Sequence, residues 1–250
     1  MNDHEFAAWA ATEAGVLLTE VRTRGLEGKE LKDAGDLASH EFLMATLAEH
    51  RPDDAVLSEE EHRGTVSSID RRTAKRVWII DPLDGTREFS EPPRDDWAVH
   101  VALWEDGELT AGAVAQPGLG MTFRTGAGLT IPEQTAAKTR LVVSRTRPPA
   151  FMAGLVETLD AELVPMGSAG AKAMSVIRGV SDAYVHAGGQ YEWDSAAPVA
   201  VARDAGLFTS RVDGSPLTYN HEDPNLPDLV ICRQELAEPI LAYLAANPPV

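Results

Sequence analysis

Apolar residues near the N-terminus recur every three or four positions, which is the pattern of an amphipathic helix. They are Phe6, Ala10, Ala14, Leu17 and Val21. We expect this helix to end near Gly25 and a second helix to begin at Asp36, a good N-cap residue. The residues expected to face the core from the second helix are Leu37, Met44, Leu47 and Ala48.

Short apolar runs with strand character follow, and turn residues separate them. The runs cover residues 55–57, 76–80, 97–104, 109–116 and 121–124. Glu105, Asp106 and Gly107 lie between two of these runs and predict a hairpin loop. This order favours a mixed, largely antiparallel sheet.

The second half of the chain alternates strands with helices. Strands are predicted at 140–144 and 182–186, and helices at 150–159, 171–178 and 195–205. For the last helix, Asp194 is the predicted N-cap and Gly206 the predicted C-terminal cap. Residues 125–138 have the Gly, Thr and Pro content of a surface loop joining two halves. We therefore predict a single α/β (α+β) domain over residues 1–250, in which helices pack on sheets.

The composition is that of a folded globular protein. Of the 250 residues 44% are hydrophobic and 24% charged, which is far from disordered or membrane extremes. No apolar run approaches the roughly 18 residues of a membrane span, and the acidic N-terminus lacks the features of a secretory signal. A cytoplasmic location is expected. Cys232, the only cysteine, has no partner for a disulfide and is expected to be a buried small hydrophobe.

The net charge of −17 restricts the binding partners. Nucleic acids and anionic membranes are disfavoured, because their binding depends on Lys and Arg side chains that neutralise phosphates. A small phosphorylated substrate stays compatible with this charge if a divalent cation inverts the local field.

An apolar strand running into a compact acidic turn is the sharpest local pattern. Residues 78–86 read Trp-Ile-Ile-Asp-Pro-Leu-Asp-Gly-Thr. Pro82 and Gly85 shape the turn so that Asp81 and Asp84 can converge, and hard oxygen ligands of this kind suit Mg²⁺. The backbone N–H groups of Gly85 and Thr86 could hold a phosphate. Taken alone, the motif could also be simply a favourable turn after a buried strand.

Two further acidic segments have equally plain structural readings. Glu59 and Glu60 follow the apolar run 55–57 and could be a solvated charged face. Trp193 and Asp194 could be a core aromatic residue and a helix cap. No Walker loop, dinucleotide fingerprint, zinc-type histidine spacing or hydrolase elbow competes with the carboxylates.

Together and in this order, the three acidic segments resemble the inositol monophosphatase and fructose-bisphosphatase superfamily. Residues 86–89, Thr-Arg-Glu-Phe, and 192–194, Glu-Trp-Asp, are similar to its CysQ branch, the 3'(2'),5'-bisphosphate nucleotidases, and especially to the actinobacterial members. The resemblance implies a layered αβαβα sandwich, a homodimer, a metal-binding half (1–137) and a substrate-recognition half (138–250).

The resemblance also assigns roles to the matched positions. Metal ligands would be Glu59, Asp81, the Leu83 carbonyl, Asp84 and Asp194, holding two or three Mg²⁺ ions, with Asp36 and Glu60 in supporting positions. Catalytic residues would be Glu59, Asp81 and Thr86: Asp81 would bridge two metal ions, and Thr86 and Glu59 would orient the attacking water. Substrate contacts would come from Leu83, Asp84, Gly85, Thr86, Arg145, Ser168, Lys172 and Asp194.

The substrate implied by the resemblance is 3'-phosphoadenosine 5'-phosphate, hydrolysed to AMP and phosphate, with 3'-phosphoadenylyl sulfate as a further substrate in sulfur assimilation. Inositol is disfavoured, because Ala187 stands where inositol monophosphatases usually carry a glutamate. Alternatives left open are a broader sugar phosphatase acting on fructose 1,6-bisphosphate or inositol 1-phosphate, and a catalytically silent phosphometabolite sensor. The family also implies sensitivity to Li⁺.

Overall fold

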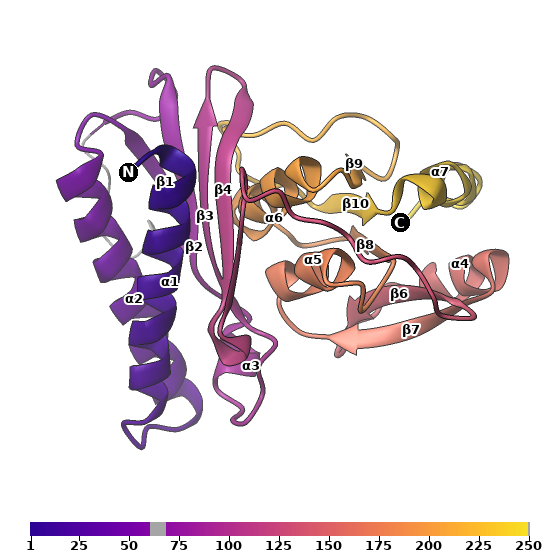
Figure 1. Cartoon of the computed structure of the whole chain (residues 1–250), viewed down its shortest axis with the longest axis horizontal. Coiled ribbons are helices and arrows are strands. Elements are labelled where there is room, and N and C mark those ends of the chain that lie inside the picture. Colours follow the sequence, from indigo (N-terminus) through magenta and orange to yellow (C-terminus); the bar gives the residue numbers. More distant parts are fainter. Residues whose placement is uncertain (61–68, 250) are drawn as a thin grey trace.

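A computed structural model describes residues 1–60 and 69–249 of the chain. Helices and sheets alternate in layers across the molecule, from the N-terminal helix pair through two sheets to a C-terminal helix pair (Figure 1). The predicted αβαβα sandwich is therefore confirmed. Three apolar clusters fill the spaces between these layers.

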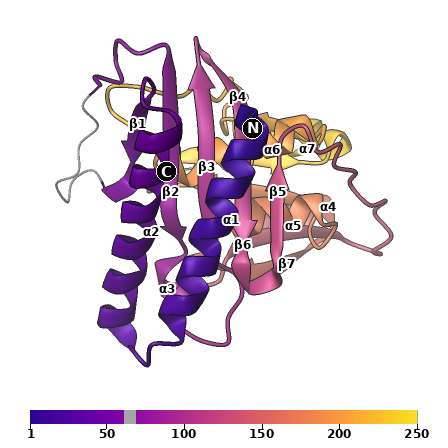
Figure 2. The ribbon, with the colours of Figure 1, turned by 60° about the vertical axis from the view of Figure 1, so that its left-hand side comes forward.

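The first layer consists of α1 (Asp3–Arg22) and α2 (Gly28–His50), which lie side by side across the first sheet (Figure 2). A capping box starts α1: Asn2 accepts a hydrogen bond from the Glu5 N–H, and Glu5 accepts one from the Asn2 N–H. The predicted apolar stripe of α1 is confirmed, because Phe6, Ala10, Ala14 and Val21 are fully buried or nearly so.

Two predictions for the second helix are wrong. Asp36 does not cap α2 but lies inside it, since the preceding polar stretch contains good helix formers and the apolar Leu31, which is only 2% exposed. The predicted core face is right for Leu47, which is buried, and partly for Met44, which is half-buried, but Leu37 is 52% exposed and Leu43 packs inward instead. Ala48, also predicted to face the core, is exposed.

The first sheet has the strand order β1-β2-β3-β4-β5. Its strands are β1 (Ala55–Ser58), β2 (Arg76–Asp84), β3 (Ala98–Glu105), β4 (Glu108–Gln116) and β5 (Met121–Arg124). Only β1 and β2 pair in parallel, which confirms a mixed, largely antiparallel sheet. The predicted hairpin between β3 and β4 is present, with Asp106 and Gly107 at positive φ. The short helix α3 (Thr86–Phe89) follows β2, and the 3₁₀ turn η2 (Pro117–Leu119) joins β4 to β5.

Residues 125–138 cross to the second sheet without forming a helix or strand, as predicted. That sheet has the order β7-β6-β8-β10-β9. Its strands are β6 (Thr139–Ser144), β7 (Ala161–Met166), β8 (Ala183–Ala187), β9 (Phe208–Ser210) and β10 (Asp228–Cys232). Only β6 and β8 were expected from the sequence. Cys232 is fully buried on β10, and this burial raises the pKa of its thiol to about 12.

The middle layer contains α5 (Ala169–Ile177) and α6 (Glu192–Asp204). Helix α6 packs on β2, β3 and β4 of the first sheet, and Gly112 permits this close approach because a Cβ there would lie 2.7 Å from the Ala200 Cβ. The outer layer consists of α4 (Met152–Leu159) and α7 (Ala237–Ala246), with the 3₁₀ turn η3 (Gln234–Leu236) before α7. Within residues 1–60 and 69–249, no helix combines the length and apolarity needed to cross a bilayer.

Helix α2 approaches the end of β2 closely at Gly35. A Cβ added there would lie 2.6 Å from Phe89 Cε1 and 3.0 Å from Leu83 Cδ2, and both of these side chains are buried. Gly35→Ala is therefore expected to destabilise the protein by about 1–2 kcal/mol, since overpacking outweighs the gain of about 1 kcal/mol in helix propensity. Urea unfolding measures the change; an unaltered or higher midpoint would show that the helix has room to move.

Candidate active site

The two acids of the turn project together because of an irregularity in β2. Asp81 pairs with His100 and Asp84 with Ala98, so three steps along β2 match two along β3. In a regular strand, residues three apart point to opposite faces, and the extra residue of a bulge restores a common side. Pro82 has no N–H to donate to a neighbouring strand, and it is tolerated here because the extra residue of a bulge makes no such hydrogen bond. Both carboxylates are buried, with Asp81 2% and Asp84 7% exposed.

Asp194 reaches the same place from the start of α6. The prediction that it is the N-cap is wrong: Tyr191 is the N-cap, and the Asp194 carboxylate accepts the Tyr191 N–H at 2.8 Å from the first turn of the helix. The side chain still lies at the helix N-terminus, where a negative charge is stabilised by the helix dipole.

Asp81, Asp84 and Asp194 form an acidic cluster, since each offers a carboxylate oxygen and these atoms lie within 4.8 Å of one another. The cluster joins the two halves of the chain. It has the hard oxygen donors and the mutual spacing suited to a divalent cation.

Glu59 lies beside this cluster because β1 runs parallel to β2. Ser58 pairs with Ile80, so the next residues along the two strands are Glu59 and Asp81, and a hydrogen bond joins their side chains. Glu60 is buried next to it.

Asp36 and Thr86 meet at the other side of the turn. The Thr86 hydroxyl lies 3.5 Å from an Asp36 oxygen and 3.2 Å from the Leu83 carbonyl oxygen. A second contact from α2 holds the turn, since the Ser39 hydroxyl donates to the Pro82 carbonyl at 2.6 Å. Inside α2, Asp36 can therefore take the supporting position expected of it.

The pKa values of the acids reflect how closely they crowd. Burial, then repulsion from Asp194, raises the pKa of Glu59 to about 8, although other parts of this residue are exposed. Burial and the charge of Asp84 raise the pKa of Asp194 to about 7. Burial and the charges of Glu59 and Asp84 raise the pKa of Asp81 well above its usual value. For Asp84 the upward effect of burial is overcome by His100, and its pKa is lowered.

This crowding predicts a pH dependence with a definite sign. Without metal, the folded protein holds protons on Glu59 and Asp194 that the unfolded chain releases near the ordinary values of 4.5 and 3.8. Stability should therefore fall as pH rises from those values to about 8, where the pKa of Glu59 lies. Thermal unfolding from pH 5 to 9, with and without MgCl₂, checks this expectation. Mg²⁺ should remove most of the decline, and a metal-free stability that rises with pH would contradict it.

Asp84 is held by the N-terminus of α5. Its Oδ2 accepts the Ser168 hydroxyl and the Gly170 N–H at 2.6 Å, and its Oδ1 accepts the Ala169 N–H at 3.0 Å. The Ser168 hydroxyl oxygen in turn accepts the Ala171 N–H and so caps the helix. The predicted Ser168 is thus brought directly to the acidic cluster.

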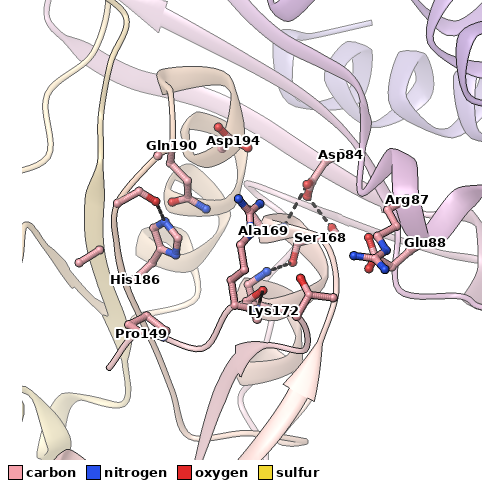
Figure 3. Close-up of a pocket in the computed structure, with 16 residues that line it drawn as sticks. Asp84, Arg87, Glu88, Pro149, Ser168, Ala169, Lys172, His186, Gln190 and Asp194 are labelled. Atoms are coloured by element: carbon pink, nitrogen blue, oxygen red, sulfur yellow. Dashed lines mark hydrogen bonds between the residues drawn. The ribbon is translucent and has the colours of Figure 1, made fainter. Parts of the chain in front are cut away.

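A cleft of about 540 Å³ opens beside these groups. Figure 3 shows Asp84 and Asp194 at one end of the cleft and His186 and Pro149 at the other. The lining residues that bear on the argument are Asp84, Arg87, Arg147, Lys172, Ala187 and Asp194. The volume is within the range usual for small-molecule sites.

Lys172 projects from α5 into this cleft and is 6% exposed. Its Nζ donates to the Ser168 carbonyl at 2.6 Å and lies 5.2 Å from the centre of the Tyr184 ring. Burial lowers the pKa of Lys172, and the charge of Asp84 partly opposes this shift. An ammonium group held in this way is suited to receive an anion.

Arg145 does not itself line the cleft. Its guanidinium donates to Glu88 and Glu91 at 2.6 Å each. Arg87 and Arg147 line the cleft instead, and sequence reasoning missed both. No local signal could have found Arg147, because β6 ends at Ser144 and residues 145 and 146 form a bend, so the alternation of a strand no longer applies.

The chain belongs to the inositol monophosphatase family, whose sequence profile matches residues 4–247. Among its relatives is the protein of Mycobacterium tuberculosis named 3'-phosphoadenosine 5'-phosphate phosphatase, which is 50% identical over 243 residues, or 93% of this chain and 90% of the relative. The Escherichia coli protein named 3'(2'),5'-bisphosphate nucleotidase CysQ is 31% identical over 198 residues, or 74% of this chain and 78% of the relative.

Solved structures of the family share the fold. CysQ from Bacteroides thetaiotaomicron superposes with a TM-score of 0.77 at 25% identity, covering 93% of this chain and 97% of that one. Inositol monophosphatase II from Staphylococcus aureus superposes with a TM-score of 0.82 at 22% identity, covering 99% and 95%. The layered architecture is thus that of known phosphatases.

Proposed function

We propose that this chain is a Mg²⁺-dependent phosphomonoesterase that hydrolyses 3'-phosphoadenosine 5'-phosphate to AMP and phosphate. The observation that carries the proposal is the convergence of Asp81, Asp84 and Asp194 at one end of a cleft whose wall contains the buried Lys172. The names of the mycobacterial and E. coli relatives support the same substrate class.

The acidic cluster fits a divalent cation on the chemistry of its donors. Carboxylates this close repel one another, and this repulsion adds to burial in raising the pKa values of Asp81 and Asp194; a cation removes that repulsion. Glu59, Asp81, Asp84, Asp194 and the Leu83 carbonyl would hold two or three Mg²⁺ ions. When bound, such ions polarise a phosphate ester and lower the pKa of water.

The residues around the cluster supply positioning and charge. Thr86 and Glu59 would orient the attacking water, and the N–H groups of Gly85 and Thr86, at the start of α3, would face a phosphate oxygen. The Gly85 backbone has a φ of 82°, a conformation that favours glycine. Asp36 would hold the Thr86 hydroxyl in place.

The cations of the cleft favour a substrate with a second phosphate. Lys172 and the neighbouring Ser168 would bind that phosphate, with Arg87 and Arg147 within the same cleft. Arg145 would act through Glu88, which also lines the cleft and is its ion-pair partner. Ala187, also in the wall, offers no carboxylate to grip a sugar hydroxyl, so inositol 1-phosphate should be a poorer substrate.

The remaining expectations stay predictions: the metal-binding and substrate-recognition halves, the homodimer, the cytoplasmic location and the inhibition by Li⁺. A silent sensor would have no use for a hydroxyl such as that of Thr86, placed to orient water. Hence we favour an enzyme.

Phosphate release from 3'-phosphoadenosine 5'-phosphate, inositol 1-phosphate and fructose 1,6-bisphosphate, each with and without MgCl₂, tests the proposal. The nucleotide should have the highest kcat/KM, and chelation should abolish its hydrolysis. If the nucleotide were the poorest of the three, the assignment would be a broader sugar phosphatase. Mg²⁺-dependent binding of all three without turnover would instead identify a sensor.

A further inference from the structure

His100 is a fully buried residue on β3 that contacts Asp84 of the acidic cluster and the residue before Asp194. Its Nδ1 lies 3.0 Å from the carbonyl oxygen of Trp193, the residue before Asp194. Its Nε2 lies 3.1 Å from Oδ2 of Asp84. The imidazole ring therefore stands between the β2 acid and the start of α6.

The surroundings of the ring are shaped to admit it. A Cβ at residue 170 would lie 2.1 Å from His100 Nε2, and Gly170 has none. Because Gly170 also donates its N–H to Asp84, the α5 N-terminus and the imidazole ring meet on the same carboxylate oxygen.

The two oxygens of Asp84 are consequently not equivalent. Oδ2 accepts hydrogen bonds from Ser168 and Gly170, which occupy its two lone pairs, and the Nε2 of His100 lies 3.1 Å from it without hydrogen-bond geometry. Among the described residues, Oδ1 accepts one hydrogen bond, from Ala169, and keeps a lone pair for a cation. The contacts on Oδ2 thus fix which oxygen Asp84 can offer.

We propose that His100 is a positioning residue for the metal site: it holds the carboxylate of Asp84 in register with Asp194 through its ion pair with Asp84 and its hydrogen bond to the Trp193 carbonyl. This inference rests on the proposed metal role of Asp84. The groups that orient a metal ligand typically change metal affinity by 10–100-fold when they are removed.

Two amide replacements separate the two contacts of the ring. The side-chain nitrogen of asparagine falls near the place of Nδ1, so His100→Asn can keep the hydrogen bond to Trp193 and loses the contact with Asp84. The side-chain nitrogen of glutamine falls near the place of Nε2, so His100→Gln can still place an N–H against Asp84. Both variants remove the ring, and they differ from each other by one methylene.

Calorimetric titration of the substrate-free protein with MgCl₂ measures the effect without turnover. We expect His100→Asn to raise the Kd for Mg²⁺ about tenfold or more, and His100→Gln to raise it by less than about threefold. Thermal unfolding without metal reports general damage to the fold and should be similar for the two variants. In assays, the Mg²⁺ concentration for half-maximal activity should follow the same order.

The outcomes distinguish the inference from the proposed function. Equal Mg²⁺ affinity in both variants, whether high or low, would overturn the positioning role, because a purely structural histidine would not discriminate between the two amides. A lack of Mg²⁺ binding by the unsubstituted protein would overturn the proposed function itself, and the role of His100 with it.

Discussion

Replacing Asp81 by asparagine is expected to reduce Mg²⁺-dependent phosphate release by at least about a hundredfold, because the metal contributes several kcal/mol to the transition state. The amide keeps the shape of the side chain and can still accept the Leu83 N–H, which now donates to Asp81 Oδ1 at 3.1 Å. The loss should therefore reflect the missing charge and not a collapsed turn. Initial rates at saturating substrate over a range of MgCl₂ concentrations measure it.

The same substitution should have the opposite effect on metal-free stability. Burial, and then repulsion from Glu59, Asp84 and Asp194, raises the pKa of Asp81. A neutral amide relieves that repulsion, so Asp81→Asn should unfold at an equal or higher temperature than the parent at pH 8 without Mg²⁺. A variant that lost activity and stability together would indicate a structural role for Asp81.

Lys172→Met is expected to lower kcat/KM for 3'-phosphoadenosine 5'-phosphate by roughly 10- to 150-fold. Methionine approximates the length of the lysine side chain but lacks the charge, and a hydrogen bond to a charged group contributes about 1.5–3 kcal/mol. For adenosine 3'-phosphate, which has no second phosphate, the decrease should be much smaller. The ratio of the two kcat/KM values isolates recognition of the second phosphate from any general effect.

Lys138→Met provides a matched control for Lys172→Met. Lys138 is an exposed lysine paired with Asp160 on the surface, outside the cleft, and exposed pairs contribute little. It should leave both kcat/KM values near those of the parent. If Lys172→Met lowered kcat/KM equally for the two substrates, Lys172 would not be the residue that binds the second phosphate.

The acidic cluster could be predicted because each acid follows a strong local signal. Asp81 and Asp84 come after an apolar strand, Glu59 after another, and Asp194 stands beside a helix start. A shared site followed from the order of these segments and their resemblance to one family. The roles of the individual residues stay predictions until variants are measured.

Other features depend on tertiary contacts that local patterns do not contain. Asp36 is as good a cap as any residue in its segment, and the packing of Leu31 and Gly35, together with the helix formers before Asp36, starts α2 already at Gly28. The strands β7, β9 and β10 are short, and pairing with their neighbours defines them. In the sequence, His100 is one residue of an apolar strand. The role proposed for it depends on contacts with Asp84 and Trp193, which lie elsewhere in the sequence.

The segment that connects the two sheets, residues 125–138, determines how the protein responds to a cut in its backbone. The contacts of residues 125–132 include the Thr125–Gly112 bonds and the bond from Arg233 to the Pro132 carbonyl. Residues 133–137 are mostly exposed and contact little beyond their own turn. A protease that cuts the backbone there breaks the chain outside the residues that line the cleft. The two fragments stay associated, because α6 of the second fragment packs on β2, β3 and β4 of the first. Nicked protein should therefore co-purify as one particle.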